Sequence, residues 1–225
     1  MITIAGLGPS GSDSLSTGAY RVIRNAPVVF VRTAHHPAVD DLEAEGITLI
    51  SMDDIYESSD TFRDVYDRIA DRILAEASDH DVVYAVPGHP LMGEQAVEII
   101  LRKARELGIE VRVIGSASFI EASMEALLTG LDSGLKIIDA LSMDTINCDT
   151  KIGNLIYQVY NRAIASDVKL ALMEDYPDDF EIRVVVGAGT TSQQVVDLPL
   201  YMLDRRDWNH LTTVYVPPLV NVLKA

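Results

Sequence analysis

The first half of the chain alternates short apolar runs with longer segments in which apolar residues recur every three or four positions. This alternation is typical of βαβ units that build a parallel sheet. The apolar runs predict strands at Ile2–Ala5, Val28–Val31, Thr48–Ser51, Val82–Val86 and Val111–Ile114. The longer segments predict helices at Thr17–Asn25, Ala38–Glu45, Thr61–Ala77 and Gly93–Leu107. We therefore expect an α/β domain with a parallel five-stranded sheet and flanking helices.

The strand rhythm weakens after residue 114, which indicates a second, smaller domain of mixed α+β type. The pattern predicts helices at Ser118–Leu128 and Asn154–Ala165, and strands at Leu135–Ile138, Lys169–Met173, Ile182–Val186 and Thr212–Val216. We place the boundary between residues 115 and 116, which gives domains 1–115 and 116–225. Pro217 and Pro218 end the last predicted strand, and they leave open whether a further domain follows residue 225.

Composition excludes several classes of protein. The 225 residues include 34 acidic and 18 basic side chains, so a net charge of −16 disfavours nucleic acid and anionic membranes as partners. The single Cys148 excludes a disulfide within the chain, and the histidines show no ligand spacing, so we expect no metal. No apolar stretch of about 18 residues and no basic leader occurs, which favours a cytosolic protein.

Three glycine-rich loops follow predicted strands of the first domain. The first, Gly6–Gly11, matches the G-x-G-x-x-G dinucleotide fingerprint, but the second strand ends in Arg32 where that fold has an acidic residue. The second, Val86–Gly93, has two prolines and two glycines, and its His89 could be a base, a ligand or a hydrogen-bonding side chain of a turn. The third, Gly115–Phe119, has small residues and a candidate helix cap at Ser118. Each loop could also be only a tight turn, but all three are expected at the sheet edge where such folds bind ligands.

Gly6-Leu7-Gly8-Pro9, Pro87-Gly88-His89-Pro90 with Met92-Gly93, and Gly115 to Phe119 together resemble the three ordered signatures of the tetrapyrrole (corrin and porphyrin) methylase family. Gln158-Val159-Tyr160 and Val168-Lys169-Leu170 resemble its second domain, so the likeness covers almost the whole chain. Leu198-Pro199-Leu200-Tyr201 and Tyr215-Val216-Pro217-Pro218 resemble the branch fused to a MazG-type nucleotide pyrophosphohydrolase. The resemblance implies a two-domain class III methyltransferase, usually a homodimer, that holds S-adenosylmethionine between its domains and releases S-adenosylhomocysteine.

The resemblance also implies which residues contact the cofactor. In the first predicted domain these are Leu7, Gly8, Pro9, Pro87, Gly88, His89, Met92 and Gly93; in the second they are Ser118, Phe119, Gln158 and Gly189. Three positions depart from the family pattern: Ser10 replaces a glycine, His89 replaces an acid, and Phe119 is bulkier than the usual small residue. Pro-Gly-His-Pro is familiar in the MazG-fused branch, so His89 is consistent with cofactor binding.

The residues themselves are consistent with this cofactor. S-adenosylmethionine has a sulfonium charge and no phosphate, so loops of backbone groups with few formal charges can hold it. Methyl transfer mainly requires alignment of nucleophile, methyl group and sulfur, and exclusion of water. A catalytic base is needed only where the acceptor must lose a proton.

For the small-molecule acceptor we nominate Arg32, Thr33 and His36, which follow the second strand, although Pro37 makes a plain surface loop an alternative. Asp13 and Glu94 are interpreted as charges at helix N-termini. Two other functions stay open: a catalytically quiet S-adenosylmethionine-binding module that regulates a fused pyrophosphohydrolase, and an NADP-binding oxidoreductase.

Overall fold

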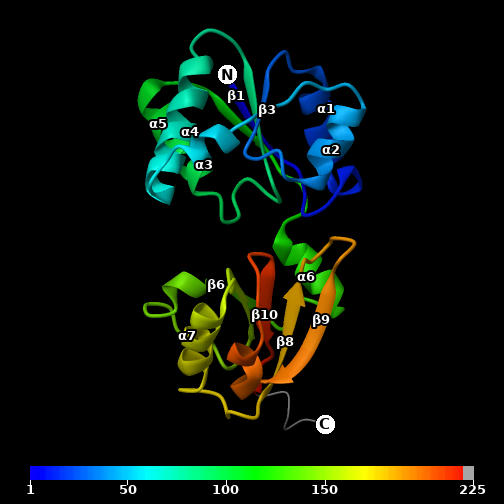
Figure 1. Ribbon diagram of the computed structural model, residues 1–225, viewed down its shortest axis with the longest axis vertical. Coiled ribbons are helices and arrows are strands. Elements are labelled where there is room, and N and C mark those ends of the chain that lie inside the picture. The colour runs from blue at the N-terminus through cyan, green and yellow to red at the C-terminus, as the bar shows by residue number, and fades with distance from the viewer. Residues whose placement is uncertain (220–225) are drawn as a thin grey trace. The chain divides into compact units, whose positions relative to one another are not determined.

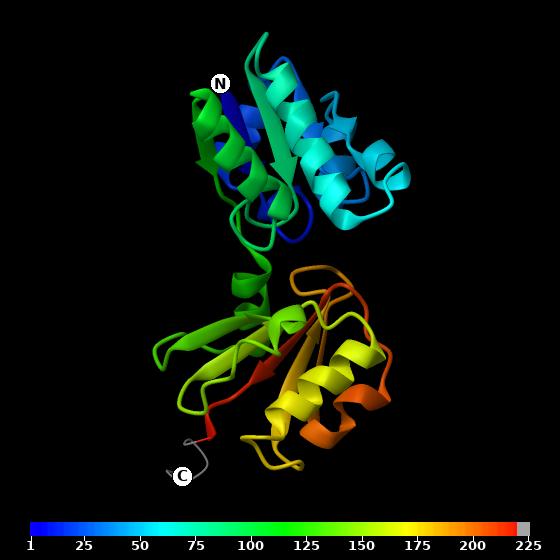
Figure 2. The same ribbon diagram turned by 90° about the vertical axis from the view of Figure 1, so that its left-hand side faces the viewer.

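The computed structural model describes residues 1–219 and divides into two compact units, Met1–Phe119 and Ile120–Ala225. The last six residues, for which the sequence predicts no helix or strand, lie outside the described part. The division falls in the first turn of helix α6 (Phe119–Leu127), four residues beyond the boundary placed from the sequence. Each unit is described by itself below (Figures 1 and 2).

The first unit is a parallel sheet with helices on both faces, as the sequence predicts. Its strands lie in the order β3-β2-β4-β1-β5, and all four pairings are parallel. The strands are β1 (Ile2–Gly6), β2 (Val29–Val31), β3 (Ile50–Ser51), β4 (Val82–Val86) and β5 (Val111–Ile114). The helices are α1 (Thr17–Asn25), α2 (Pro37–Ala44), α3 (Asp53–Glu57), α4 (Phe62–Glu76) and α5 (Gln95–Leu107), with a short 3-10 turn η1 (Ser12–Ser14).

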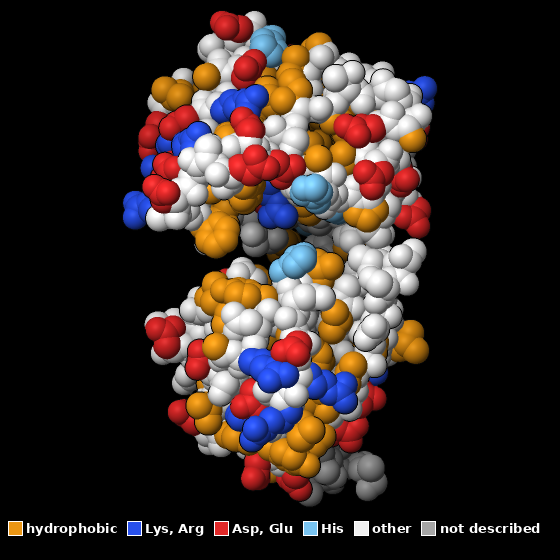
Figure 3. Space-filling view, viewed as in Figure 1, with side chains coloured by type: hydrophobic (Ala, Val, Ile, Leu, Met, Phe, Trp, Pro, Cys, Tyr) orange, Lys and Arg blue, Asp and Glu red, His pale blue; other side chains and the backbone are white. Residues whose placement is uncertain are grey.

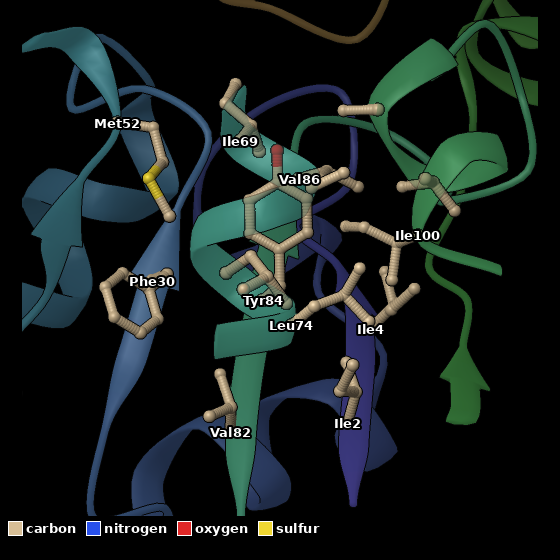
Figure 4. Close-up of a cluster of buried hydrophobic side chains, with 14 of the residues drawn as sticks. Ile2, Ile4, Phe30, Met52, Ile69, Leu74, Val82, Tyr84, Val86 and Ile100 are labelled. Atoms are coloured by element: carbon tan, nitrogen blue, oxygen red, sulfur yellow. The ribbon is translucent and has the colours of Figure 1, made fainter. Parts of the chain in front are cut away.

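The two faces of this sheet pack into two separate cores because side chains alternate along each strand. On β4, Val82, Tyr84 and Val86 pack with α3, α4 and α5, whereas Val83 and Ala85 pack with α1 and α2. Figure 4 shows the first of these cores, with the Tyr84 ring among Ile4, Ile69 and Ile100. Burial on both faces explains why the strands are continuous apolar runs in the sequence.

The second unit is a mixed sheet whose strands lie in the order β6-β7-β10-β8-β9. Only β6 and β7 pair in parallel, and the remaining neighbours are antiparallel. The strands are β6 (Leu135–Asp139), β7 (Gly153–Tyr157), β8 (Glu181–Val186), β9 (Gln194–Pro199) and β10 (Thr212–Val216). Helix α7 (Arg162–Leu172) and the 3-10 turns η2 (Ala140–Ser142) and η3 (Leu200–Arg205) pack into the core of this unit.

Two elements predicted for the second domain are wrong. Residues 154–157 form the buried strand β7, where the sequence predicts the start of a helix. The prediction failed because a short apolar run buried between two neighbouring strands has no period that distinguishes it from a helix. Residues 169–172 lie in α7 instead of a strand. Ala165, Val168 and Leu172 face the core at helical spacing, while Lys169 pairs with Asp204 of η3.

Charge is distributed differently over the two units. In the view of Figure 3, acidic side chains are spread over the first unit, whereas Lys and Arg side chains gather over α7 and η3 of the second. In that group Arg162 pairs with Asp207 at 2.8 Å, and Lys169 and Arg205 both pair with Asp204. These three basic side chains are therefore paired with carboxylates.

Candidate functional site

Three loops meet at the carboxyl edge of the first sheet because β1 lies between β4 and β5. The loops after β1 and β4 join through a two-residue bridge: the Gly8 amide donates to the Gly88 carbonyl at 3.1 Å, and the Gly88 amide donates to the Gly8 carbonyl at 2.7 Å. The Leu7 amide also donates to the Val86 carbonyl, at 2.8 Å. Backbone hydrogen bonds therefore join the two segments that carry the first two sequence signatures.

Gly8 and Gly88 both need a left-handed backbone, with φ of 77° and 64°. Their surroundings differ. A Cβ on Gly8 would lie 2.3 Å from the Ser14 hydroxyl oxygen, whereas a Cβ on Gly88 would meet no atom within 4 Å. Gly8 is thus required by packing within the protein, and Gly88 presents bare backbone to open space, where a ligand can approach it.

The third loop is fastened to the first by Ser116, which is buried. Its hydroxyl donates to the Gly6 carbonyl at 2.6 Å and accepts the Ser16 amide at 2.9 Å. The Ser16 hydroxyl donates to the Gly115 carbonyl at 2.7 Å and also caps α1 by accepting from the Ala19 amide. These bonds hold the loops after β1 and β5 together without any charged group.

His89 acts as a hydrogen-bonding side chain of the second loop. Its Nδ1 accepts the Leu91 amide at 3.1 Å, so that nitrogen is unprotonated and the neutral ring carries its proton on Nε2. The ring lies against Gly115, where an added Cβ would be only 2.3 Å from Nε2. Of the three roles that the sequence allowed, the one in the turn fits this geometry, and the contact joins the second loop to the third.

The remaining predicted residues of the first unit lie around these loops. Pro9 and Pro87 are half-buried beside the glycine bridge, and Met92 and Gly93 are exposed just before α5. Ser118 is buried at 2% exposure directly before α6, and Phe119 is the first residue of that helix. All ten predicted cofactor residues up to Phe119 therefore belong to the loops after β1, β4 and β5, or to the start of α6.

The acceptor candidates follow β2, next to β4 in the sheet. His36 caps α2 because its Nδ1 accepts the Ala38 amide at 3.3 Å, and a hydrogen bond with the Gly8 backbone ties it to the first loop. Burial and the Arg32 charge lower the pKa of His36, against the opposing effect of that bond. Thr33 instead accepts the His35 amide at 3.1 Å and bonds Asp53 of α3. Arg32 and His36 are thus brought close to the glycine loops, while Thr33 is engaged with α3.

Glu94, interpreted from the sequence as a charge at a helix N-terminus, has a side-chain partner that the sequence does not indicate. It stands at the N-cap of α5, as a helix N-terminal charge should, but its side chain makes no capping hydrogen bond. Its Oε1 instead pairs with Arg32 Nη1 at 3.1 Å, and only 7% of the side chain is exposed. Burial raises the pKa of Glu94 to about 7, although the Arg32 charge opposes that shift. Asp13, by contrast, lies exposed in the first turn of η1, as expected.

The second unit contributes two further predicted residues at the ends of its strands. Gln158 follows β7 with a left-handed φ of 64°, and its amide nitrogen donates to Asp139 at 3.2 Å. Such a backbone is uncommon for a non-glycine residue and is frequent at functional sites. Gly189, with φ of 78°, lies in the connection from β8 to β9, where its amide donates to the Gln193 side chain at 2.8 Å.

Two other properties of the described residues bear on the chemistry. No group of three or more His, Cys, Asp or Glu among residues 1–219 is arranged to hold a metal ion. In the same range, no helix combines the length and the apolar character needed to span a membrane.

Comparison with known proteins identifies related sequences and structures. Residues 1–204 match the model of a family described as Tetrapyrrole (Corrin/Porphyrin) Methylases. Protein YabN of Bacillus subtilis (strain 168) is 38% identical over 219 residues, which are 97% of this chain and 45% of YabN. The chain therefore spans about half the length of that relative.

Solved structures show the same fold at low sequence identity. A uroporphyrin-III-C-methyltransferase from Thermus thermophilus aligns with a TM-score of 0.75 at 19% identity, over 98% of this chain and 93% of that one. The Thermus thermophilus enzyme complexed with S-adenyl homocysteine aligns with a TM-score of 0.70 at 18% identity, over 99% of both chains. A putative diphthine synthase from Entamoeba histolytica aligns with a TM-score of 0.72 at 17% identity, over 100% and 97%.

Proposed function

Because this chain belongs to the tetrapyrrole (corrin/porphyrin) methylase family, we propose that it binds S-adenosylmethionine and transfers its methyl group to a small-molecule acceptor. The observation that carries the proposal is the bridge between Gly8 and Gly88, which leaves open space at Gly88. The similar Thermus thermophilus structure with S-adenyl homocysteine supports the choice of cofactor.

The three joined loops can hold a sulfonium nucleoside with backbone groups. Leu7, Gly8, Pro9, Pro87, Gly88 and His89 bear no formal charge in the geometry described, and neither do Met92, Gly93, Ser118 and Phe119. A positively charged cofactor needs no phosphate-neutralising lysine there. Gln158 and Gly189 of the second unit are the remaining proposed contacts, and Gln158 has a left-handed backbone of the kind that is frequent at functional sites.

The acceptor side of the proposed site consists of Arg32 and His36. Methyl transfer is an in-line displacement, so the protein must align the acceptor with the methyl group and exclude water. Arg32 can pair with an anionic group of the acceptor. His36, whose pKa is lowered, is neutral at pH 7 and can orient the acceptor from its place beside Gly8. Both residues lie on the loop between β2 and α2, and β2 neighbours β4 in the sheet.

The proposal also concerns the longer protein to which this chain can belong. Because the chain spans 45% of YabN, the methylase portion can be one part of a longer protein. From the resemblance to the MazG-fused branch, we propose that the other part is a pyrophosphohydrolase. From what is usual in the family, we propose that the protein is a cytosolic homodimer. In that setting a portion that binds the cofactor without turnover would act as a regulator.

Calorimetric titration with S-adenosylmethionine, S-adenosylhomocysteine and NADPH tests the cofactor. We expect the first two to bind and NADPH to give no heat. No observation favours the oxidoreductase, since α1 begins only at Thr17, well after the G-x-G-x-x-G loop. Preference for NADPH would overturn the proposal, while binding without methyl transfer to any offered acceptor would leave the regulatory role.

The Gly88→Ala substitution tests the position of the site. The added methyl group projects into open space, so we expect the affinity for S-adenosylhomocysteine to fall at least about tenfold, a loss of about 1.4 kcal/mol. Gly108→Ala is the matched control, because Gly108 has a φ of 69° and equal open space but ends α5 away from the loops. Both variants should lose about 1 kcal/mol of stability from the left-handed backbone. Equal affinities in the two variants would refute the site.

A further inference from the structure

A groove with a volume of about 350 Å³ lies in the second unit. One wall is the connection from η2 to β7, and the other is α7 with the turn that follows it. Figures 1 and 2 show these two segments side by side, and η2 contacts α7. None of the residues that line this groove, called the α7 groove below, is among those proposed for the cofactor or the acceptor.

Helix α7 presents a second face besides the one that packs into the core. This face consists of Asp167, Leu170 and Ala171, and Glu174 continues it in the turn after the helix. Leu170 lies in its middle and is 59% exposed, so more than half of a large apolar side chain stays uncovered. On the opposite wall Ile146 is 37% exposed. Apolar side chains from both walls are therefore open to a partner.

The charged side chains that line the α7 groove are all acidic. They are Asp144, Asp167, Glu174 and Asp175. None of the four forms an ion pair with another residue of the described range 1–219. Lys169 of the same helix pairs with Asp204 of η3, and the Lys136 ammonium donates to the Asn147 carbonyl. The groove thus combines exposed apolar side chains with uncompensated negative charge.

The backbone of the two walls favours a helix as the occupant. Helix α7 satisfies its own backbone groups, and the amides of Thr145 and Ile146 on the other wall donate to the Ser142 carbonyl. The walls therefore offer side chains and no strand edge, so an extended peptide would gain no ladder of backbone hydrogen bonds. A helix needs no such ladder, and it can insert apolar residues spaced every three or four positions.

We propose that the α7 groove is a docking site for a basic amphipathic helix of a partner protein. Apolar residues of that helix would cover Ile146 and Leu170, and its Lys or Arg residues would face the four carboxylates. Like charges around one groove repel each other, and a cationic partner removes that repulsion. The proposal does not depend on methyl transfer, because the groove shares no residue with the proposed site.

Charge complementarity selects this partner over two other occupants. The net charge of −16 disfavours both an anionic membrane and a second copy of the chain. A second copy could offer the basic side chains over α7 and η3, but Arg162, Lys169 and Arg205 are already paired with carboxylates. A helix with unpaired cations is therefore the better complement.

Calorimetric titration of the full chain with an amphipathic peptide of leucine and lysine tests the proposal. The leucines of this peptide recur every three or four positions, and a peptide of the same composition in scrambled order is its control. We expect the patterned peptide to bind at least about fivefold more tightly, because only its leucines can cover both walls at once. Circular dichroism should show that the peptide gains helix on binding.

The Leu170→Ser variant tests the apolar part of the groove. We expect it to bind the patterned peptide about fivefold more weakly, because the uncovered part of this side chain is what the peptide buries. Leu107→Ser is the matched control, since Leu107 is 66% exposed at the end of α5 in the other unit. Its affinity for the peptide should equal that of the unaltered protein.

A double variant tests the charged part. Asp144→Asn/Glu174→Gln removes two carboxylates from the groove, and Asp60→Asn/Glu98→Gln removes two exposed carboxylates from the first unit. Both change the net charge equally. We expect about threefold weaker binding in the groove variant alone at physiological ionic strength, because salt screens distant charges. All four positions are exposed, so both variants should fold.

Four outcomes would overturn the proposal. They are no heat with the patterned peptide, equal affinity for the scrambled one, equal losses in the groove and control variants, and a bound peptide without helix. Sedimentation of the unaltered protein and of Leu170→Ser adds a fifth. A dimer that dissociates in Leu170→Ser would show that a second copy covers the groove instead.

Discussion

At the residue scale, the site depends on which partner each polar side chain finds. His89 and Glu94 look alike in the sequence, since each is a polar residue of the loop between β4 and α5. In the structure the His89 Nδ1 accepts a backbone amide two residues away, whereas Glu94 pairs with Arg32 after a different strand. A local partner makes His89 a part of the turn, whereas burial raises the pKa of Glu94 against the opposing effect of its distant partner Arg32. Perturbed groups of this kind are frequent at functional sites.

The raised pKa of Glu94 makes stability depend on pH. Its pKa is about 7 in the folded protein and near 4.5 when unfolded, so the folded state binds more protons between these values. The stability from this group is fully present below pH 4.5 and is lost as pH rises through 7. Between pH 4.5 and pH 8, the unfolding free energy should fall by on the order of 3 kcal/mol more in the unaltered protein than in Glu94→Gln.

Urea unfolding at several pH values measures this difference. Glu98→Gln is the control, because an exposed carboxylate on the same helix should leave the pH profile unchanged. Parallel profiles for the unaltered protein and Glu94→Gln would contradict the assignment of the shifted group.

At the scale of elements, the loops after β1, β4 and β5 form one unit because their strands are neighbours. The bridge between Gly8 and Gly88 joins the first two, and the contact of the His89 ring with Gly115 joins the second to the third. Ser116 joins the third loop to the first, because its hydroxyl donates to the Gly6 carbonyl. The loops therefore should respond to substitution together.

The Gly115→Ala substitution tests this coupling. Its Cβ would lie 2.3 Å from His89 Nε2, so the ring must leave and the Leu91 amide loses its acceptor. We expect a loss of about 1–3 kcal/mol of stability. In a Gly115→Ala/His89→Ala variant the clash is absent, so the double variant should be more stable than the sum of the single effects by about 1 kcal/mol or more. Additive free energies from urea unfolding would show that the two loops are independent.

At the scale of the whole molecule, each unit has its own hydrophobic core. The first unit has a core on each face of its sheet, and the second packs α7 and η3 against β7, β8 and β10. Proposed cofactor residues occur in both units, so the proposed function requires that substitutions in either one weaken binding. Gln158 of the second unit offers the sharpest case.

The Gln158→Gly substitution separates binding from stability. Glycine relieves the left-handed backbone by about 1 kcal/mol, while loss of the bond to Asp139 costs a similar amount, so stability should change by less than about 1 kcal/mol. The affinity for S-adenosylhomocysteine, measured by calorimetry, should nevertheless fall. Leu128→Gly is the control, because Leu128 has a φ of 50° and is 93% exposed, so stability should rise and binding should persist. Unchanged binding in Gln158→Gly would remove this residue from the site.

Much of the first unit could be predicted from the sequence, and less of the second. All five strands of the parallel sheet are predicted near their observed positions, because strands buried on both faces appear as apolar runs between helical periods. In the second unit, residues 154–157 and 169–172 are assigned to the wrong type of element. Strand β7 owes its conformation to pairing with β6 and β10, and such long-range pairing leaves no local period.

Local sequence patterns were enough to predict the parallel α/β layer, the three glycine loops and the methylase family, because periodicity, turn chemistry and motif order are local properties. Which groups act on one another depends instead on how the elements pack. Arg32 meets Glu94 because β2 and β4 are neighbours in the sheet, and α5 begins just beyond β4. Burial then sets the charge state of Glu94, and burial is a property of the surrounding fold that no single segment encodes.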